Sequence, residues 1–279
     1  NVSIAYTGLR SLGKYRSALV SQGNFRTTFH YETKNNQYNV RGHIATQDIL
    51  NEESGGLTAE SILAFTNNDP NFSDRARLDV NLDDTENYLQ GSRVYLEQDY
   101  QLLSSKDSAN QKDFTNLKIG HILVSSKNTY EFRQNAPSNF IGATNYSGNI
   151  RDNVKNTFLK NQFFLEFNSK YVLGTFKAKT SIMNYSHGYD NIINQTSNIN
   201  TRKLRGSAIS FGADWRAKVS KFQLDASGEI TPGAARLAGT NLRGNLSFKK
   251  DSLFYIKAGV LLNSKSPNFN YLLHQSTYD

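Results

Sequence analysis

The residue types that most often bind metals or activate nucleophiles are spread thinly along this 279-residue sequence. Cysteine is absent, which excludes thiolate ligands and cysteine nucleophiles. His30 and His43 fall on the two arms of one predicted hairpin and could meet, so a weak metal site stays open as an alternative to structural or lining roles. None of the five histidines belongs to a metal-binding HxH or HExxH motif. The five are His30, His43, His121, His187 and His274.

An acidic run begins like a calcium-binding EF-hand loop, because Asp79, Asn81 and Asp83 have the right spacing. The match then fails, since Asp84 stands where the loop requires glycine and Gln90 where it requires a bidentate glutamate. No GxSxG, P-loop or paired-carboxylate motif stands out either. We therefore expect a solvated acidic loop, no enzymatic activity, no cofactor and no metal.

The strongest pattern is the alternation of apolar and polar residues. In residues 242–262 apolar side chains recur at every second position on both sides of a break at 250–252. The intervening positions carry charged, polar or small residues. This pattern predicts a β-hairpin with one apolar and one polar face.

The same alternation predicts eleven strands and an all-β fold, an antiparallel up-and-down meander in a single domain. The strand 114–133 alternates least well, because Ile122 and Val124 break the pattern and His121 falls on the apolar face. The predicted strands lie near residues 2–9, 24–33, 37–48, 92–103, 114–133, 157–168, 171–187, 204–219, 221–230, 241–250 and 253–264.

Short and long connections alternate between these strands. Tight turns are predicted at 34–36, 169–170, around 220 and at 250–252, with a middling link at 104–112; long connections are predicted at 10–23, 49–91, 134–156, 188–203 and 231–240. Short turns at one end and long loops at the other are typical of outer-membrane β-barrels. Seven aromatic residues near the short turns would form an interfacial girdle there: Tyr31, Tyr38, Phe167, Tyr171, Phe222, Phe248 and Phe254.

The 49–91 connection is long enough to hold structure of its own. LTAESILAF offers Thr58 as the cap of a short helix, and DDTENYLQG offers Asp83 or Asp84 as a cap with Gly91 as a stop. We expect this loop to be partly structured, either covering the mouth of a barrel or folding into it.

Composition narrows the class of protein. A mean hydropathy of −0.59 leaves no run near the roughly 20 apolar residues of a spanning helix, whereas a barrel dilutes its apolar signal over alternate positions. The net charge of +8 is scattered singly, without the continuous basic stripe that nucleic-acid binding needs.

Charged residues on the polar face are candidates for lining a water-filled interior, with about twelve basic against seven acidic side chains. This excess would favour anions, unless the charges pair across strands and fill the space. Thirteen of these charged residues, ten basic and three acidic, are the pore-lining candidates: Arg26, Arg41, Arg93, Lys118, Lys160, Lys177, Lys179, Asp214, Arg216, Asp225, Glu229, Arg243 and Lys257.

Four segments resemble the putative porin family of Bacteroidota outer membranes: KNNQYNVRGH (34–43), NEESGGL (51–57), DPNFSDRARLDVNLDDTENYLQG (69–91) and PNFNYLLHQSTYD (267–279). The resemblance covers most of the chain and implies a β-barrel in the bacterial outer membrane with a pore role and no catalytic residues. Members of that family extend beyond both ends of this chain. We therefore expect an internal fragment of a longer barrel.

The leading hypothesis is a passive, porin-like channel for small hydrophilic solutes. Its expected partners are the lipid bilayer and the solutes, with envelope proteins as further candidate partners. Two alternatives stay open. One is a soluble or surface β-sandwich that binds glycans or proteins. The other is a plugged barrel that scaffolds an envelope assembly.

Overall fold

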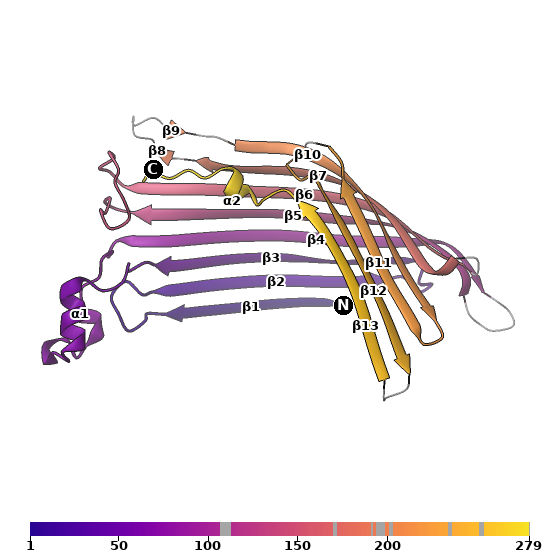
Figure 1. The fold of residues 1–279 in the computed structure, drawn as a ribbon, viewed down its shortest axis with the longest axis horizontal. Coiled ribbons are helices and arrows are strands. Elements are labelled where there is room, and N and C mark those ends of the chain that lie inside the picture. The colour runs from indigo at the N-terminus through magenta and orange to yellow at the C-terminus, as the bar shows by residue number, and fades with distance from the viewer. Residues whose placement is uncertain are drawn as a thin grey trace.

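One antiparallel sheet of eleven strands, ordered β1-β2-β3-β4-β5-β6-β7-β10-β11-β12-β13, makes up most of the computed structural model (Figure 1). The structure describes residues 1–106, 113–169, 172–190, 192–193, 199–200, 203–233, 236–250 and 254–278. The strands of this sheet are β1 (Val2–Ser11), β2 (Val20–Glu32), β3 (Tyr38–Glu52), β4 (Thr85–Lys106), β5 (Asp113–Gln134), β6 (Ile150–Ser169), β7 (Val172–Asp190), β10 (Lys203–Val219), β11 (Phe222–Thr231), β12 (Gly239–Lys250) and β13 (Phe254–Lys265). A separate pair, β8 (Ile192–Ile193) with β9 (Ile199–Asn200), lies in the connection between β7 and β10.

The register sorts the side chains onto two faces, because residues paired across strands point to the same side of a sheet. Phe29 pairs with Gly42, which pairs with Leu96, and Leu96 pairs with Leu123. We call this side the apolar face and the opposite side the polar face. Across the sheet the apolar face carries Ile4, Phe29, Ile44, Leu96, Leu123, Leu165, Ile182, Phe211, Ile230, Leu246 and Ile256.

All eleven predicted strands are present and pair in sequence order, so the predicted meander is confirmed. The weak alternation of the 114–133 segment did not prevent it from pairing along its length with β4 and β6. His121 does lie on the apolar face, opposite Gln98.

The 49–91 connection is shorter than predicted, since β3 runs to Glu52 and β4 begins at Thr85. The predicted helix between Asp83 or Asp84 and Gly91 is therefore wrong. Residues 85–91 pair with β3 on one side and β5 on the other, and this double pairing outweighs a local capping signal.

The helix predicted after Thr58 is confirmed as α1 (Ala59–Thr66), where the Thr58 side chain accepts a hydrogen bond from the Ser61 amide. Two 3₁₀ turns follow, η1 (Pro70–Phe72) and η2 (Arg75–Arg77), and α2 (Phe269–Leu272) is a single turn after β13. None of the helices in the described ranges is long and apolar enough to cross a membrane.

Short connections lie at one end of the sheet and long ones at the other. The turn between β2 and β3 contains Asn36 and the turn between β10 and β11 contains Ser220, both with positive φ (56° and 52°). The turns predicted at 169–170 and 250–252 lie partly outside the described residues, as does the 104–112 link. Long connections join the strands at the opposite end, which we call the long-loop end; the other is the short-turn end.

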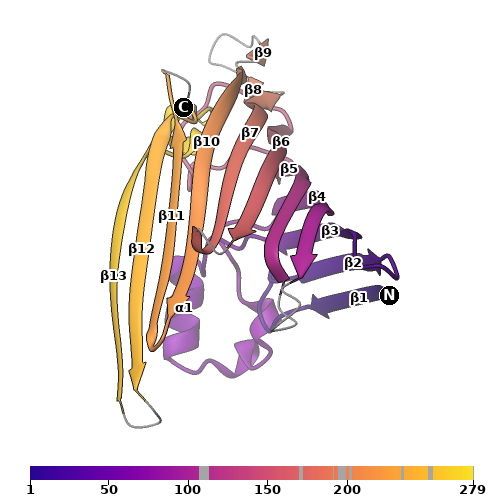
Figure 2. The ribbon, with the colours of Figure 1, turned by 90° about the vertical axis from the view of Figure 1, so that its right-hand side faces the viewer.

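The sheet curves into a trough whose two edge strands, β1 and β13, do not pair with each other (Figure 2). No second sheet in the described part of the chain covers the apolar face, because Phe211, Phe254 and Ile256 remain 53%, 50% and 52% exposed. Large apolar side chains thus form the outside of an open curved wall.

All six described members of the predicted aromatic girdle lie on the apolar face close to the short turns. Phe222 contacts Phe248, and Phe248 contacts Phe254, at ring-centroid separations of 4.8 and 6.2 Å. Tyr171 lies outside the described residues. The aromatic rings therefore form a row along the short-turn edge of β11 to β13.

Candidate functional site

The polar face is the concave side of the trough and forms the candidate site. Lys160 on β6 reaches Glu229 on β11, at 3.8 Å between Nζ and Oε1, across the two intervening strands. Such a reach is feasible only on the inside of a bend. The register places every pore-lining candidate on this face: Arg26, Arg41, Arg93, Lys118, Lys160, Lys177, Lys179, Asp214, Arg216, Asp225, Glu229, Arg243 and Lys257.

A chain of ion pairs crosses the polar face from β3 to β10. Arg41 pairs with Glu97 at 2.7 Å, and Lys118 with Asp99 at 3.7 Å. Further along, Lys177 pairs with Glu166 at 3.4 Å and Lys179 with Asp214 at 2.8 Å. We call these eight residues the ion-pair belt. Because each cation has a carboxylate beside it, the belt is polar but close to electrically neutral.

Phe164 packs within the belt and explains one glycine. A Cβ atom at Gly120 would lie 2.1 Å from the Phe164 ring, so only glycine leaves room for the ring on the polar face. The Lys177 ammonium lies 3.8 Å from the centroid of the same ring, a cation–π contact that fixes its position beside Glu166.

Small side chains line the polar face of β7 and β10 on the long-loop side of the ion-pair belt. Ser181 and Ser210 are each 1% exposed, and Ser210 donates a hydrogen bond to Glu229 at 2.8 Å. Their small size lets Lys160 pass over them to reach Glu229.

The segment after β13 turns into the trough and packs on the polar face of β5 to β7 at the long-loop end; we call residues 266–278 the inner strap (Figure 1). Its strongest anchor is Asp152, which accepts hydrogen bonds from the Thr277 amide at 2.8 Å, the Thr277 hydroxyl, and the Ser276 hydroxyl at 3.3 Å. Asp152 and Thr277 are both buried. The carboxylate therefore holds the end of the strap against β6.

Aromatic contacts hold the middle and end of the strap. Phe269 stacks on Tyr185 and on His187, with centroid separations of 5.0 and 5.5 Å. The Tyr278 hydroxyl donates to Gln134 and accepts from the Ser138 amide at 2.9 Å. Burial raises the pKa of the Tyr278 hydroxyl, which further favours its protonated, hydrogen-donating form.

Five of the candidate cations form no ion pair with any described residue: Arg26, Arg93, Arg216, Arg243 and Lys257. Arg26 and Arg93 lie on either side of Ala45, which pairs with both. Of the candidate carboxylates, Asp225 is likewise without an ion pair within the described ranges and accepts a hydrogen bond from Gln223 instead. The polar face thus combines a neutral belt with separate cationic positions.

The two histidines of the predicted hairpin do not meet. His30 bonds to Asn39 at 2.8 Å, whereas His43 stacks on Tyr95 with a centroid separation of 5.2 Å. Among the residues described, no group of three or more His, Cys, Asp or Glu could hold a metal ion. The sequence predicted which cations lie on the polar face, but it did not predict the inner strap. The residues of the strap show no alternation, and they bond to partners up to 144 positions away.

A comparison with protein-family models decides the family: the model described as putative porin matches residues 1–279. The chain belongs to this porin family. A comparison with curated proteins finds no match. The predicted resemblance is therefore confirmed, and the family points to an outer-membrane β-barrel channel rather than to an enzyme.

Membership of the porin family indicates which surroundings each face of the sheet fits. A barrel wall in an outer membrane has an apolar band toward lipid and a polar interior. In this porin-family chain the apolar face fits the band toward lipid, and the polar face fits the interior.

Proposed function

We propose that the chain is part of the wall of an outer-membrane β-barrel through which small hydrophilic solutes pass passively. The observation that carries this proposal is the sorting of side chains by the register of one uninterrupted eleven-strand meander: aromatic and aliphatic residues on the convex side, and all the candidate charged residues on the concave side. Closure would need further strands between the edges β1 and β13, because backbone groups in lipid need partners.

The proposed path runs along the polar face, with the thirteen pore-lining candidates as its charged lining. The ion-pair belt would supply polar groups without a strong bias in charge. The unpaired cations, such as Arg26, Arg93 and Arg243, would give the path a mild preference for anions through the field they add to a narrow aqueous space.

We infer that the path narrows near the long-loop end. The inner strap occupies the concave side there, against β5 to β7. The loop between β3 and β4 adds to this, because its helix α1 lies beyond that end and projects over the space inside the curve (Figures 1 and 2). These two segments are also what a plugged, scaffolding barrel would have, so we keep that alternative as a second candidate.

Reconstitution of the full-length protein in planar bilayers tests the proposal. We expect discrete conductance steps and, in a salt gradient, a reversal potential that indicates a modest preference for anions. Protein that inserts but never conducts would favour the scaffold. Protein that stays in the aqueous phase on detergent partitioning would contradict the barrel altogether.

A further inference from the structure

Polar side chains interrupt the apolar face on four neighbouring strands: Tyr38 on β3, Gln98 on β4, His121 on β5 and Asn161 on β6. The Tyr38 hydroxyl donates to Gln98 Oε1 at 2.9 Å, and His121 Nε2 lies 3.1 Å from Asn161 Oδ1. Gln98 and His121 are direct partners across β4 and β5. We call these four residues the outer polar strip.

Tyr38 lies at the short-turn border of the apolar band, whereas Gln98, His121 and Asn161 lie within the band. On both sides of these three residues along β4, β5 and β6 the same face carries aromatic or aliphatic residues: Leu96 and Tyr100, Leu123 and Ile119, Leu159 and Phe163. The amide N–H groups of Gln98 and Asn161 have no hydrogen-bond acceptor among the described residues. Acyl chains offer no acceptor, so such donors facing lipid alone are costly.

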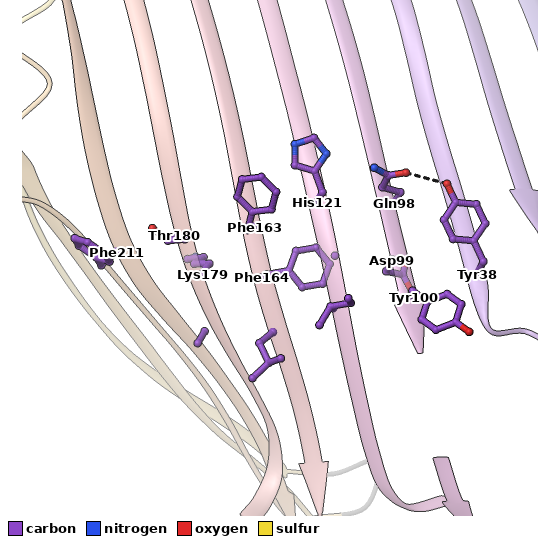
Figure 3. A pocket seen from close by; sticks show the side chains of 14 residues that line it. Tyr38, Gln98, Asp99, Tyr100, His121, Phe163, Phe164, Lys179, Thr180 and Phe211 are labelled. Carbon is purple, nitrogen blue, oxygen red and sulfur yellow. Dashed lines mark hydrogen bonds between the residues drawn. The ribbon is translucent and has the colours of Figure 1, made fainter. Parts of the chain in front are cut away.

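A hollow adjoins the strip on the same face (Figure 3). Its volume is about 750 Å³, and its lining combines Gln98 and His121 with apolar groups such as Ile119 and Leu165. The Phe163 ring packs against His121, at 4.8 Å between centroids, and remains 51% exposed. The face therefore presents a protruding ring, a hollow and unused hydrogen-bond donors side by side.

We propose that the outer polar strip and its hollow form an interface with a second copy of this chain inside the membrane. Carboxamides donate and accept hydrogen bonds, so the strip is complementary to itself when two copies meet about a twofold axis. The free N–H groups of Gln98 and Asn161 then reach amide oxygens of the other copy. The exposed Phe163 ring fills the hollow of its neighbour.

This inference rests on the proposed function, because it requires the apolar face to lie in lipid. Cysteine cross-linking in native outer membranes tests it, since these 279 residues include no cysteine. Leu165→Cys places a thiol at the interface, and Leu159→Cys gives a second position there beside Asn161, and both leave the Phe163 ring in place. Leu246→Cys is the matched control for Leu165→Cys: it lies on the same face at similar exposure, 47% against 45%, but on β12.

We expect oxidation to yield a homodimer at least several-fold more abundant for Leu165→Cys and Leu159→Cys than for Leu246→Cys. Adding Gln98→Leu and Asn161→Leu should reduce this yield to the level of the control while the protein remains folded and inserted. Equal yields at all positions would overturn the interface, as would cross-linking of the β6 thiols only to a different protein.

A water-soluble maleimide distinguishes failure of this inference from failure of the proposed function. If the wall is in lipid, the Leu246→Cys thiol reacts slowly, whatever happens at β6. Rapid labelling of Leu246→Cys would show that the apolar face is in water, and both the interface and the barrel would then be refuted. Slow labelling without preferential cross-linking at β6 would refute the interface alone.

Discussion

Removing the Asp152 carboxylate should release the inner strap and widen the proposed path. Asp152 accepts three hydrogen bonds from the strap, two of them from Thr277, and both residues are buried. A hydrogen bond to a charged group contributes about 1.5–3 kcal/mol. Asp152→Ala also relieves the cost of burying the carboxylate, so we expect a net loss of about 3 kcal/mol of docking free energy.

A loss of about 3 kcal/mol raises the undocked population of the strap about 100-fold. The assay is single-channel recording of the full-length protein in planar bilayers. Asp152→Ala should give larger or more frequent open levels than the unmodified protein. The conductance should return toward normal with Asp152→Asn, which keeps an acceptor oxygen for the Thr277 groups.

Asp225→Ala is the matched control, because Asp225 lies on the same polar face and, within the described ranges, accepts a hydrogen bond only from Gln223 on its own strand. It removes one negative charge without touching the strap. If Asp152→Ala and Asp225→Ala change the conductance equally, charge and not strap docking is responsible. An unchanged conductance in folded, inserted Asp152→Ala would refute the strap as a narrowing.

Two further predictions concern the faces and the lining charges. Ile256→Lys should destabilise the folded barrel by about 2–4 kcal/mol if the side chain faces the middle of the bilayer, while Lys257→Gln should cost little. Urea titration in detergent or lipid measures both free energies of unfolding, and equal costs would contradict the assignment of faces. Arg26→Glu with Arg93→Glu should move the reversal potential toward cation selectivity, whereas Arg205→Glu on the apolar face should not; identical shifts for the pair and the control would show that the two arginines do not line the path.

The sheet could be predicted from the sequence because its signal is local. Side chains alternate with a period of two, so residues 242–262 already show which positions share a face. The cap at Thr58 was predictable for the same reason, since it depends on one side chain and an amide three residues later. Boundaries were less accurate: β4 begins at Thr85 because pairing with two neighbours extends a strand into residues that also carry helix-capping signals.

The contacts on the polar face could not be predicted because they join residues that are far apart in the chain. Lys160 and Glu229 meet only through the curvature of the sheet, and the inner strap bonds to residues on β6 and β5 that lie 125 and 144 positions before their partners. Which cations of the polar face pair and which stay unpaired likewise depends on diagonal geometry, as in Lys179 with Asp214. The sequence indicated one anomaly correctly, His121 on the apolar face, without indicating that Gln98 and Asn161 accompany it.

The most direct test of the central claim is a cysteine-labelling scan through β12 of the inserted protein with a water-soluble maleimide. We expect reaction at Arg243, Asn245 and Ser247 and protection at Leu242, Leu246 and Phe248, a strict alternation along one strand. Uniform labelling, or the opposite alternation, would contradict a wall with lipid on one side and water on the other.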